Sequence, residues 1–250
     1  KMEGLKEALQ YTANLARENE KTEVLEICGK TYANRDLTRY DKILKAEPVR
    51  ASSLSALLDY IANRSEEFPD GRNMMLHIVS PKEVRLVSGL DVERGRECLF
   101  VSEAEVSEFC FENWYDQERF IIELQANFAA SPDRELLLKV AGNVEQKNDQ
   151  SFADDGVTQV VTMKTGVAQK GDVLVPNPVV LVPYRTFQEV DQPSSQFVFR
   201  IRDGKEPTFM LLEAQNQIWK NEAVGNIKRF LAEALTDMPD EVSDRLTIIG

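Results

Sequence analysis

The sequence has few of the residues from which most catalytic and metal sites are built. Histidine occurs once in 250 residues, at His77, and cysteine three times, at Cys28, Cys98 and Cys110. A serine–histidine or cysteine–histidine mechanism would have to use His77, which lies inside an expected strand. Most zinc and iron sites need several histidine or cysteine ligands, so they are disfavoured too. The cysteines form no CxxC pair, which predicts free thiols in a reducing compartment.

Motifs for nucleotide and hydrolytic chemistry are also absent. The sequence contains no GxxxxGK[ST], GxGxxG, GxSxG or HExxH, and the glycines of Gly166–Gly171 have the wrong spacing for a dinucleotide loop. Two acidic clusters are present, Asp154–Asp155 and Glu103–Glu108. We interpret both as solvated surface, with magnesium binding at the first as an alternative. We therefore expect no catalytic residue, no cofactor and no metal site.

Long apolar runs and positive charge are the other two shortages. No run of about 18 apolar residues occurs, and the first residues lack a signal-peptide core, so no membrane partner is expected. The 30 lysine and arginine residues are outnumbered by 42 aspartate and glutamate residues, which leaves a formal net charge of −12. An acidic surface repels phosphate backbones, so nucleic acid is a disfavoured partner unless a local basic groove exists.

Period-two alternation of apolar residues is the clearest pattern that is present, and it is typical of a sheet with one buried face. It predicts two meanders. Their strands are expected over Met74–Ser80, Glu83–Leu90 and Arg96–Ser102, and over Val179–Val190, Gln196–Arg202 and Thr208–Glu213. The second meander has an Asp203-Gly204 dipeptide, a strong hairpin signal. The pattern leaves open whether the two meanders share one sheet. Further strands are expected over Glu23–Gly29, Val157–Val167 and Leu246–Ile249, and a turn over Gln169–Asp172.

Apolar residues at helical spacing predict four to five helices. The expected ranges are Glu3–Asn19, Ala51–Glu67, Asp116–Ala130, Pro132–Val144 and Ile218–Leu235. Ser52 or Ser53 is expected to cap the second helix, and Ser131-Pro132-Asp133 to start the fourth. The fold class is α+β, mainly antiparallel sheet with packed helices. A polar loop over Glu145–Gly156 suggests domains 1–146 and 147–250, with a single continuous domain as the alternative.

One aromatic and basic group of residues is a candidate contact surface. It consists of Tyr184, Arg185, Phe187, Arg200 and Arg202. On extended strands, such a face could stack bases and pair with phosphates. The alternative is that the aromatic rings are core and the arginines pair with surface carboxylates. Several prolines interrupt the first of these strands, which predicts an edge strand and therefore the place for an interface to a partner.

Five stretches carry a family resemblance. They are Leu76–Leu90, Arg119–Phe128, Leu136–Val144, Asp154–Val161 and Asn177–Gly204. In order and spacing, they resemble an uncharacterised family of tailed-phage and prophage proteins, a domain of unknown function, over roughly residues 70–250. The resemblance implies a protein of the bacterial cytoplasm, made during phage growth or from a resident prophage. It implies no catalytic residue.

These observations favour a non-enzymatic phage- or prophage-derived accessory protein that self-assembles into a homo-oligomer, such as a ring or a shell. Exposed sheet edges invite pairing with another copy, and closed symmetric oligomers are the common outcome. One alternative is an accessory to phage DNA replication or recombination that binds single-stranded DNA. Another is an acidic inhibitor of a host defence protein. A metal-dependent enzyme using Asp154 and Asp155 is the last. The expected partner is a second copy of the chain, and the alternative partner is a host or phage protein.

Overall fold

The computed structural model describes residues 2–19, 22–27, 29–34, 44–69, 71, 73–143, 158–165, 169–202 and 206–250. The chain forms two compact units, the N-terminal unit (Lys1–Lys45) and the main unit (Ala46–Gly250). Over these described ranges, no helix combines the length and the apolar character that a membrane span requires.

The N-terminal unit consists of a helix and a hairpin. Helix α1 (Met2–Asn19) confirms the first predicted helix. Strands β1 (Val24–Ile27) and β2 (Lys30–Ala33) pair antiparallel. The turn between them contains Gly29 at φ +72°, a left-handed conformation that glycine adopts without strain. The first strand was expected from sequence, whereas β2 was not. All side chains described in this unit are exposed, so none of them belongs to a buried core.

A five-stranded sheet forms one half of the main unit. Its strands, in spatial order, are β13 (Leu246–Ile249), β4 (Met74–Ser80), β5 (Glu83–Ser88), β6 (Cys98–Glu103) and β3 (Val49–Ala51). The central β4, β5 and β6 are antiparallel and confirm the first predicted meander. The two outer strands run parallel to their neighbours, β13 to β4 and β3 to β6. The sheet is therefore mixed, which agrees with the predicted α+β class and adds two parallel pairings to the expected, mainly antiparallel sheets. Alternation predicts strands but not their direction, and parallel strands need a crossover connection, which the helices provide here.

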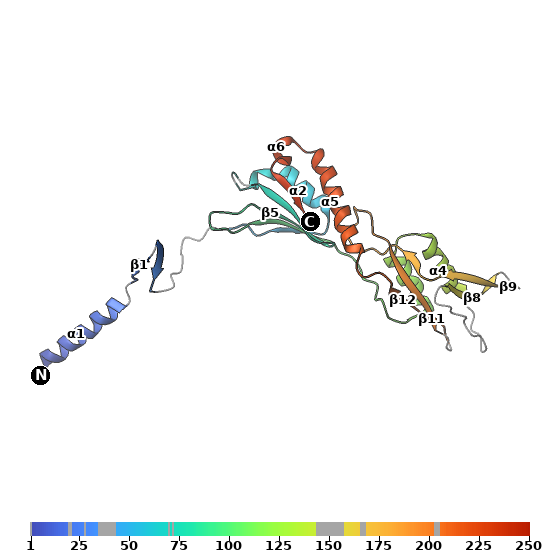
Figure 1. Ribbon diagram of the computed structural model, residues 1–250, viewed down its shortest axis with the longest axis horizontal. Coiled ribbons are helices and arrows are strands. Elements are labelled where there is room, and N and C mark those ends of the chain that lie inside the picture. The colour runs from blue at the N-terminus through green and yellow to red at the C-terminus, as the bar shows by residue number, and fades with distance from the viewer. Residues whose placement is uncertain are drawn as a thin grey trace. The chain divides into compact units, whose positions relative to one another are not determined.

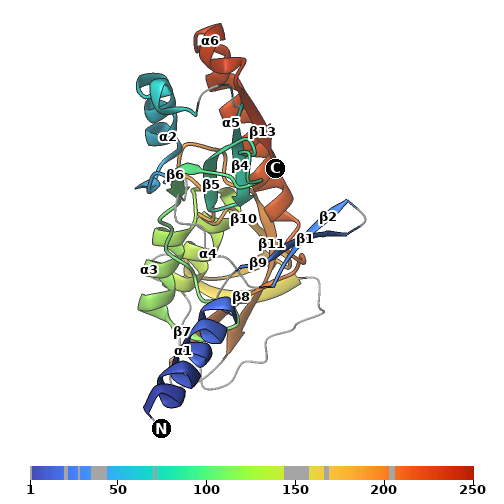
Figure 2. The same cartoon turned by 90° about the vertical axis from the view of Figure 1, so that its left-hand side faces the viewer.

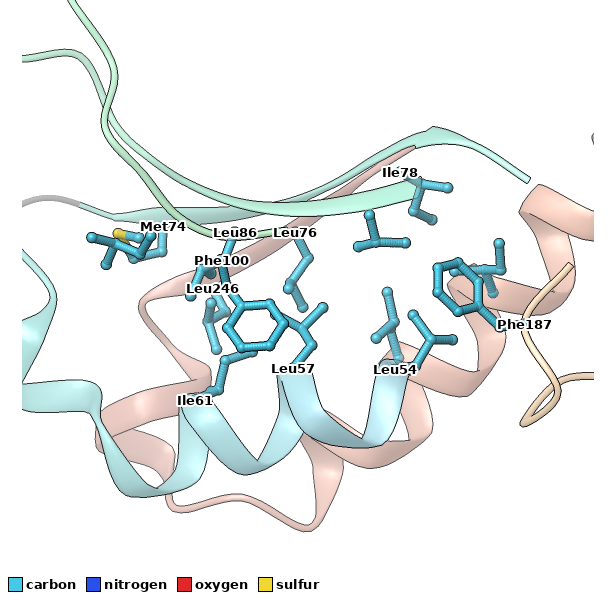
Figure 3. Close-up of a cluster of buried hydrophobic side chains, with 14 of the residues drawn as sticks. Leu54, Leu57, Ile61, Met74, Leu76, Ile78, Leu86, Phe100, Phe187 and Leu246 are labelled. Atoms are coloured by element: carbon cyan, nitrogen blue, oxygen red, sulfur yellow. The ribbon is translucent and has the colours of Figure 1, made fainter. Parts of the chain in front are cut away.

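Helices α2 (Leu54–Asn63), α5 (Trp219–Thr236) and α6 (Asp240–Ser243) lie on one side of this sheet (Figure 1). Ser53 caps α2, because its Oγ accepts a hydrogen bond from the amide of Ala56 at 3.2 Å. The helix ends earlier than expected and is followed by a 3-10 turn, η1 (Ser65–Glu67). Figure 3 shows the apolar stripe of α2 pointing into the space beneath the sheet. The labelled side chains there are Leu54, Leu57 and Ile61 from α2, facing Leu76, Leu86 and Phe100 from the strands.

A four-stranded antiparallel sheet forms the other half. Its order is β10 (Val179–Leu181), β11 (Ser195–Arg202), β12 (Thr208–Glu213) and β7 (Tyr115–Asp116). Helices α3 (Gln117–Asn127) and α4 (Pro132–Asn143) lie side by side next to it (Figure 2). Asp116 caps α3 by accepting from the amide of Arg119 at 2.8 Å, and Ser131 caps α4 as predicted. Aromatic rings fill the core between them: Phe120 lies 5.1 Å from Phe209, centroid to centroid.

The second meander is confirmed in order, and the two meanders lie in different sheets. Its first strand is shorter than expected, ending at Leu181 instead of Val190. Beyond it, only an isolated bridge joins Pro183 to Phe128. Proline has no amide hydrogen to donate to a ladder, and this explains why the strand stops there.

A separate hairpin pairs β8 (Thr158–Thr165) with β9 (Gln169–Pro176). The predicted strand over Val157–Val167 is thereby confirmed over its described part, whereas the predicted turn at Gln169–Asp172 is wrong. Those residues form the start of β9, because their backbone groups pair with β8 across the hairpin. Their polar side chains give no sign of this pairing in the sequence. Three other predictions lie outside the described residues: the loop Glu145–Gly156, the turn Asp203-Gly204 and the carboxylates Asp154 and Asp155.

The main unit runs from Ala46 to Gly250, and the domain boundary suggested near residue 147 falls inside it. Both of its sheets combine strands from the two sides of that position. In the five-stranded sheet β13 pairs with β4, and in the four-stranded sheet β12 pairs with β7.

Candidate functional site

The segment between β10 and β11 connects the two cores of the main unit. Thr186 donates its hydroxyl to the carbonyl of Pro81, in the turn between β4 and β5, at 2.5 Å. Phe187 is buried in the core under the five-stranded sheet, at the right of the view in Figure 3. The neighbouring Arg185 faces the other core. This segment therefore holds the two halves of the unit together.

Arg185 is a buried cation, with only 7% of its surface exposed. Its guanidinium lies over three rings, at 4.7 Å from the centroid of Trp219, 5.3 Å from Phe197 and 5.5 Å from Phe111. Its Nη1 donates to Glu213 Oε1 at 2.9 Å and to Ser195 Oγ at 3.3 Å. Aromatic faces carry negative quadrupole density, so the rings and Glu213 compensate the buried charge.

The surroundings of Arg185 compensate its buried charge and its hydrogen-bond donors only in part. Burial lowers the pKa of the guanidinium below its ordinary value, and Glu213 opposes this shift through its charge and hydrogen bond. Arginine nevertheless stays protonated at any physiological pH. Its Nη2 is shielded from solvent and has no hydrogen-bond partner. An unpaired buried donor on a charged group is costly, and such groups in native proteins need an explanation.

Arg185 lines a cavity of about 250 Å³, which we name the Arg185 cavity. Its charged lining residues are Lys82, Glu108, Arg185, Glu213 and Lys220. Three cations and two carboxylates leave one net positive charge, in a chain whose formal net charge is −12. Lys82 pairs with Glu108, and this pair lowers the pKa of the Glu108 carboxyl through the hydrogen bond and the charge of Lys82.

The N-terminus of α5 also borders the cavity, through Gln217, Trp219 and Lys220. No side chain caps this 18-residue helix. Lys220 Nζ donates to Gln217 Oε1 at 2.8 Å and lies 5.9 Å from the Trp219 ring. The amides of Lys220 and Asn221 donate to the backbone carbonyls of Gln217 and Ile218, at 3.0 Å and 3.1 Å. The positive end of the helix dipole still favours negative charge nearby.

The five residues of the sequence-predicted contact surface do not share one face. Arg185 and Phe187 are buried, each beside a different core, while Tyr184 is partly exposed at the cavity rim. Arg200 and Arg202 lie on the side of β11 opposite to Phe197 and Phe199. The segment after Pro183 is not a strand, so the assumed alternation of side chains does not apply to it.

Arg202 stacks on Trp114, 4.0 Å from its ring centroid, so the two arginines of β11 belong to a different surface from Arg185. The cavity residues that sequence reasoning missed are Lys82, Glu213, Trp219 and Lys220. They come from a strand turn, a strand end and a helix start, and no local pattern joins such positions.

The N-terminal unit carries the other notable surface. Its uncovered apolar side chains are Leu5, Leu9, Tyr11 and Leu15 on α1, Val24, Leu25, Ile27 and Tyr32 on the hairpin, and Leu44 beyond them. Leu5 and Leu9 are 65% and 63% exposed. Exposed apolar patches of this kind mark interaction surfaces.

The described part of the chain contains no cluster of three or more histidine, cysteine, aspartate or glutamate residues that could hold a metal ion. No family model, curated protein or solved structure matches this chain. Its fold and site define an α+β protein with antiparallel and mixed sheets and a buried cation between two cores.

Proposed function

We propose that this chain is a non-enzymatic, phage- or prophage-derived accessory protein that self-assembles through its N-terminal unit into a closed homo-oligomer, a ring or a shell. The observation that carries the proposal is the row of uncovered apolar side chains on α1 and the β1–β2 hairpin. A helix and a two-stranded hairpin without a core are at best marginally stable in water. A second surface is needed to cover them.

The spacing along α1 favours a second copy as that surface. In an antiparallel pair of α1 helices centred on Thr12, Leu9 of one copy lies level with Leu15 of the other, and Ala8 with Ala16. Such a contact is self-complementary, as two-fold interfaces require. Closed assemblies are the usual result of such pairing, and the resemblance to phage and prophage proteins supplies the biological context.

Light scattering after size-exclusion chromatography tests the proposal. The full chain of 28.4 kDa should elute with a mass that is a multiple of that value. The variant Leu9→Glu/Leu15→Glu should elute as a smaller species, because buried carboxylates oppose pairing. Electron micrographs of the purified protein distinguish a ring from a shell.

A matched control places the same two glutamates on the main unit. Val92→Glu/Ile122→Glu replaces side chains that are 92% and 56% exposed, so its mass should equal that of the original chain. A monomeric full chain would refute self-assembly. An unchanged mass in Leu9→Glu/Leu15→Glu would exclude α1 as the contact.

A further inference from the structure

We propose that the Arg185 cavity binds a small aromatic monocarboxylate. Two independent observations favour an anion there. The first is Arg185 Nη2, which is buried and has no partner. The second is the N-terminus of α5, the positive end of its helix dipole, which borders the same cavity. A carboxylate is an anion that a helix N-terminus favours, and its oxygens are strong acceptors for a guanidinium nitrogen.

The charge of the lining limits the ligand to a single negative charge. Glu108 and Glu213 already neutralise two of the three cations, through the pairs with Lys82 and Arg185. Lys220 is the third cation, and its side chain contacts an amide oxygen, Gln217 Oε1, and the aromatic ring of Trp219. A doubly charged phosphate would face two carboxylates and only one net positive charge, so a monoanion fits better.

The uncharged part of the lining indicates an aromatic body. Phe111, Tyr184 and Trp219 all border the cavity, and aromatic pairs add favourable energy beyond the area they bury. A volume of about 250 Å³ is below the range of pockets for drug-sized ligands. A benzoate-sized molecule therefore matches the site better than a nucleotide does.

Trp219 reports on ligand entry. The Nη2 atom is out of reach of solvent and the guanidinium lies over three rings, so a neighbouring group must move before a ligand reaches this atom. Trp219 is the half-buried ring nearest to the guanidinium, at 4.7 Å, and it starts α5. The chain has only two tryptophans. The full-length variant Trp114→Phe leaves Trp219 as the sole indole and keeps a ring beside Arg202.

The experiment titrates this variant with benzoate, benzamide, acetate and phosphate at constant ionic strength and follows tryptophan fluorescence. Benzoate should give a saturable change with a Kd near or below ~1 mM, since small ligands of this size rarely bind much more tightly. Benzamide, which has the same ring without the charge, should bind at least tenfold more weakly. Acetate and phosphate should also bind more weakly than benzoate.

A second variant tests the location of the site. Lys220→Gln should weaken benzoate binding at least fivefold, whereas Lys228→Gln, the same change on an exposed position of α5 outside the cavity, should leave it unchanged. The proposal is overturned by the absence of a saturable benzoate response, by a different ranking of the four probes, or by equal effects of the two lysine changes.

Discussion

At the scale of single residues, the ion pair between Arg185 and Glu213 decides how the buried charge is tolerated. Glu213→Gln leaves Arg185 buried without its counter-charge and should lower the free energy of unfolding by about 2 kcal/mol. Replacing both partners, as Arg185→Met/Glu213→Leu, removes the charge and keeps apolar contact with the rings. This double variant should lie within about 1 kcal/mol of the original chain.

Urea unfolding followed by circular dichroism measures both variants. The double variant could instead be as unstable as Glu213→Gln. That result would mean that the contacts of the guanidinium with Phe111, Phe197 and Trp219 contribute more to the free energy of unfolding than the ion pair with Glu213 does.

Tyr60 gives a prediction about pH at the same scale. Burial raises its pKa above the ordinary value, and so do the hydrogen bond and the charge of Glu67, whose carboxylate accepts from the Tyr60 hydroxyl at 2.6 Å. The folded chain therefore holds the hydroxyl proton of Tyr60 more tightly than the unfolded chain does. The contribution of this hydroxyl to the free energy of unfolding is full below pH ~10, the pKa of an unfolded tyrosine, and is lost as pH rises above it.

The comparison with Tyr60→Phe isolates this effect. The stability advantage of the original chain over the variant should shrink between pH 8 and pH 11, as measured by urea unfolding. Repeating the comparison in a Glu67→Gln background should give a smaller pH dependence. An advantage that stays constant with pH in the original background would contradict the assignment.

At the scale of elements, the start of α2 depends on one of two adjacent serines. Ser53 caps the helix through the amide of Ala56, while the exposed Ser52 does not. Ser53→Ala should lower the free energy of unfolding by about 1 kcal/mol, the usual contribution of an N-cap hydroxyl. Ser52→Ala is the matched control and should change it by less than about 0.5 kcal/mol. Equal effects in chemical unfolding would mean that the cap contributes little.

Helix starts were predictable from sequence because their signals are local. The Ser131-Pro132-Asp133 signal correctly placed α4, and Asp116 correctly placed α3. The structure adds a long-range role for Asp133, whose carboxylate accepts from the amide of Val180 in β10 at 2.6 Å. The strands of both meanders were also predictable, because alternation follows from burial on one face, except for the end of β10, which lies at Leu181 instead of Val190.

Strand direction and sheet membership were not predictable, because they depend on distant segments. Nothing in Leu246–Ile249 indicates that it runs parallel to β4, and nothing in Val49–Ala51 indicates that it runs parallel to β6. The candidate site shows the same limit. The sequence singled out Arg185 as a candidate contact residue. The face on which it was expected assumed a strand through residue 185, but the strand ends four residues earlier, at Leu181. Glu213 and Trp219, its main partners, are separated from it by a whole hairpin.

At the scale of the whole molecule, folding and assembly are expected to depend on different units. In the part of the chain that the structure describes, every buried core residue lies at or after Leu54, within the main unit. The side chains of the N-terminal unit whose burial the structure describes are all exposed. Stability should therefore come from the main unit, and the assembled mass from the N-terminal unit.

Deleting residues 1–45 separates the two contributions. The shortened chain begins at Ala46, the first residue of the main unit. Its nitrogen donates to Glu97 Oε1 at 2.7 Å in the original chain and becomes a terminal ammonium, which still carries hydrogens to donate. Its thermal midpoint should differ from that of Leu9→Glu/Leu15→Glu by less than about 4 °C, the shift expected for 1 kcal/mol in a domain of this size. Light scattering should give a monomer. A folded shortened chain that still assembles would move the interface to the main unit, and a large fall in the midpoint would show that the N-terminal unit stabilises the fold.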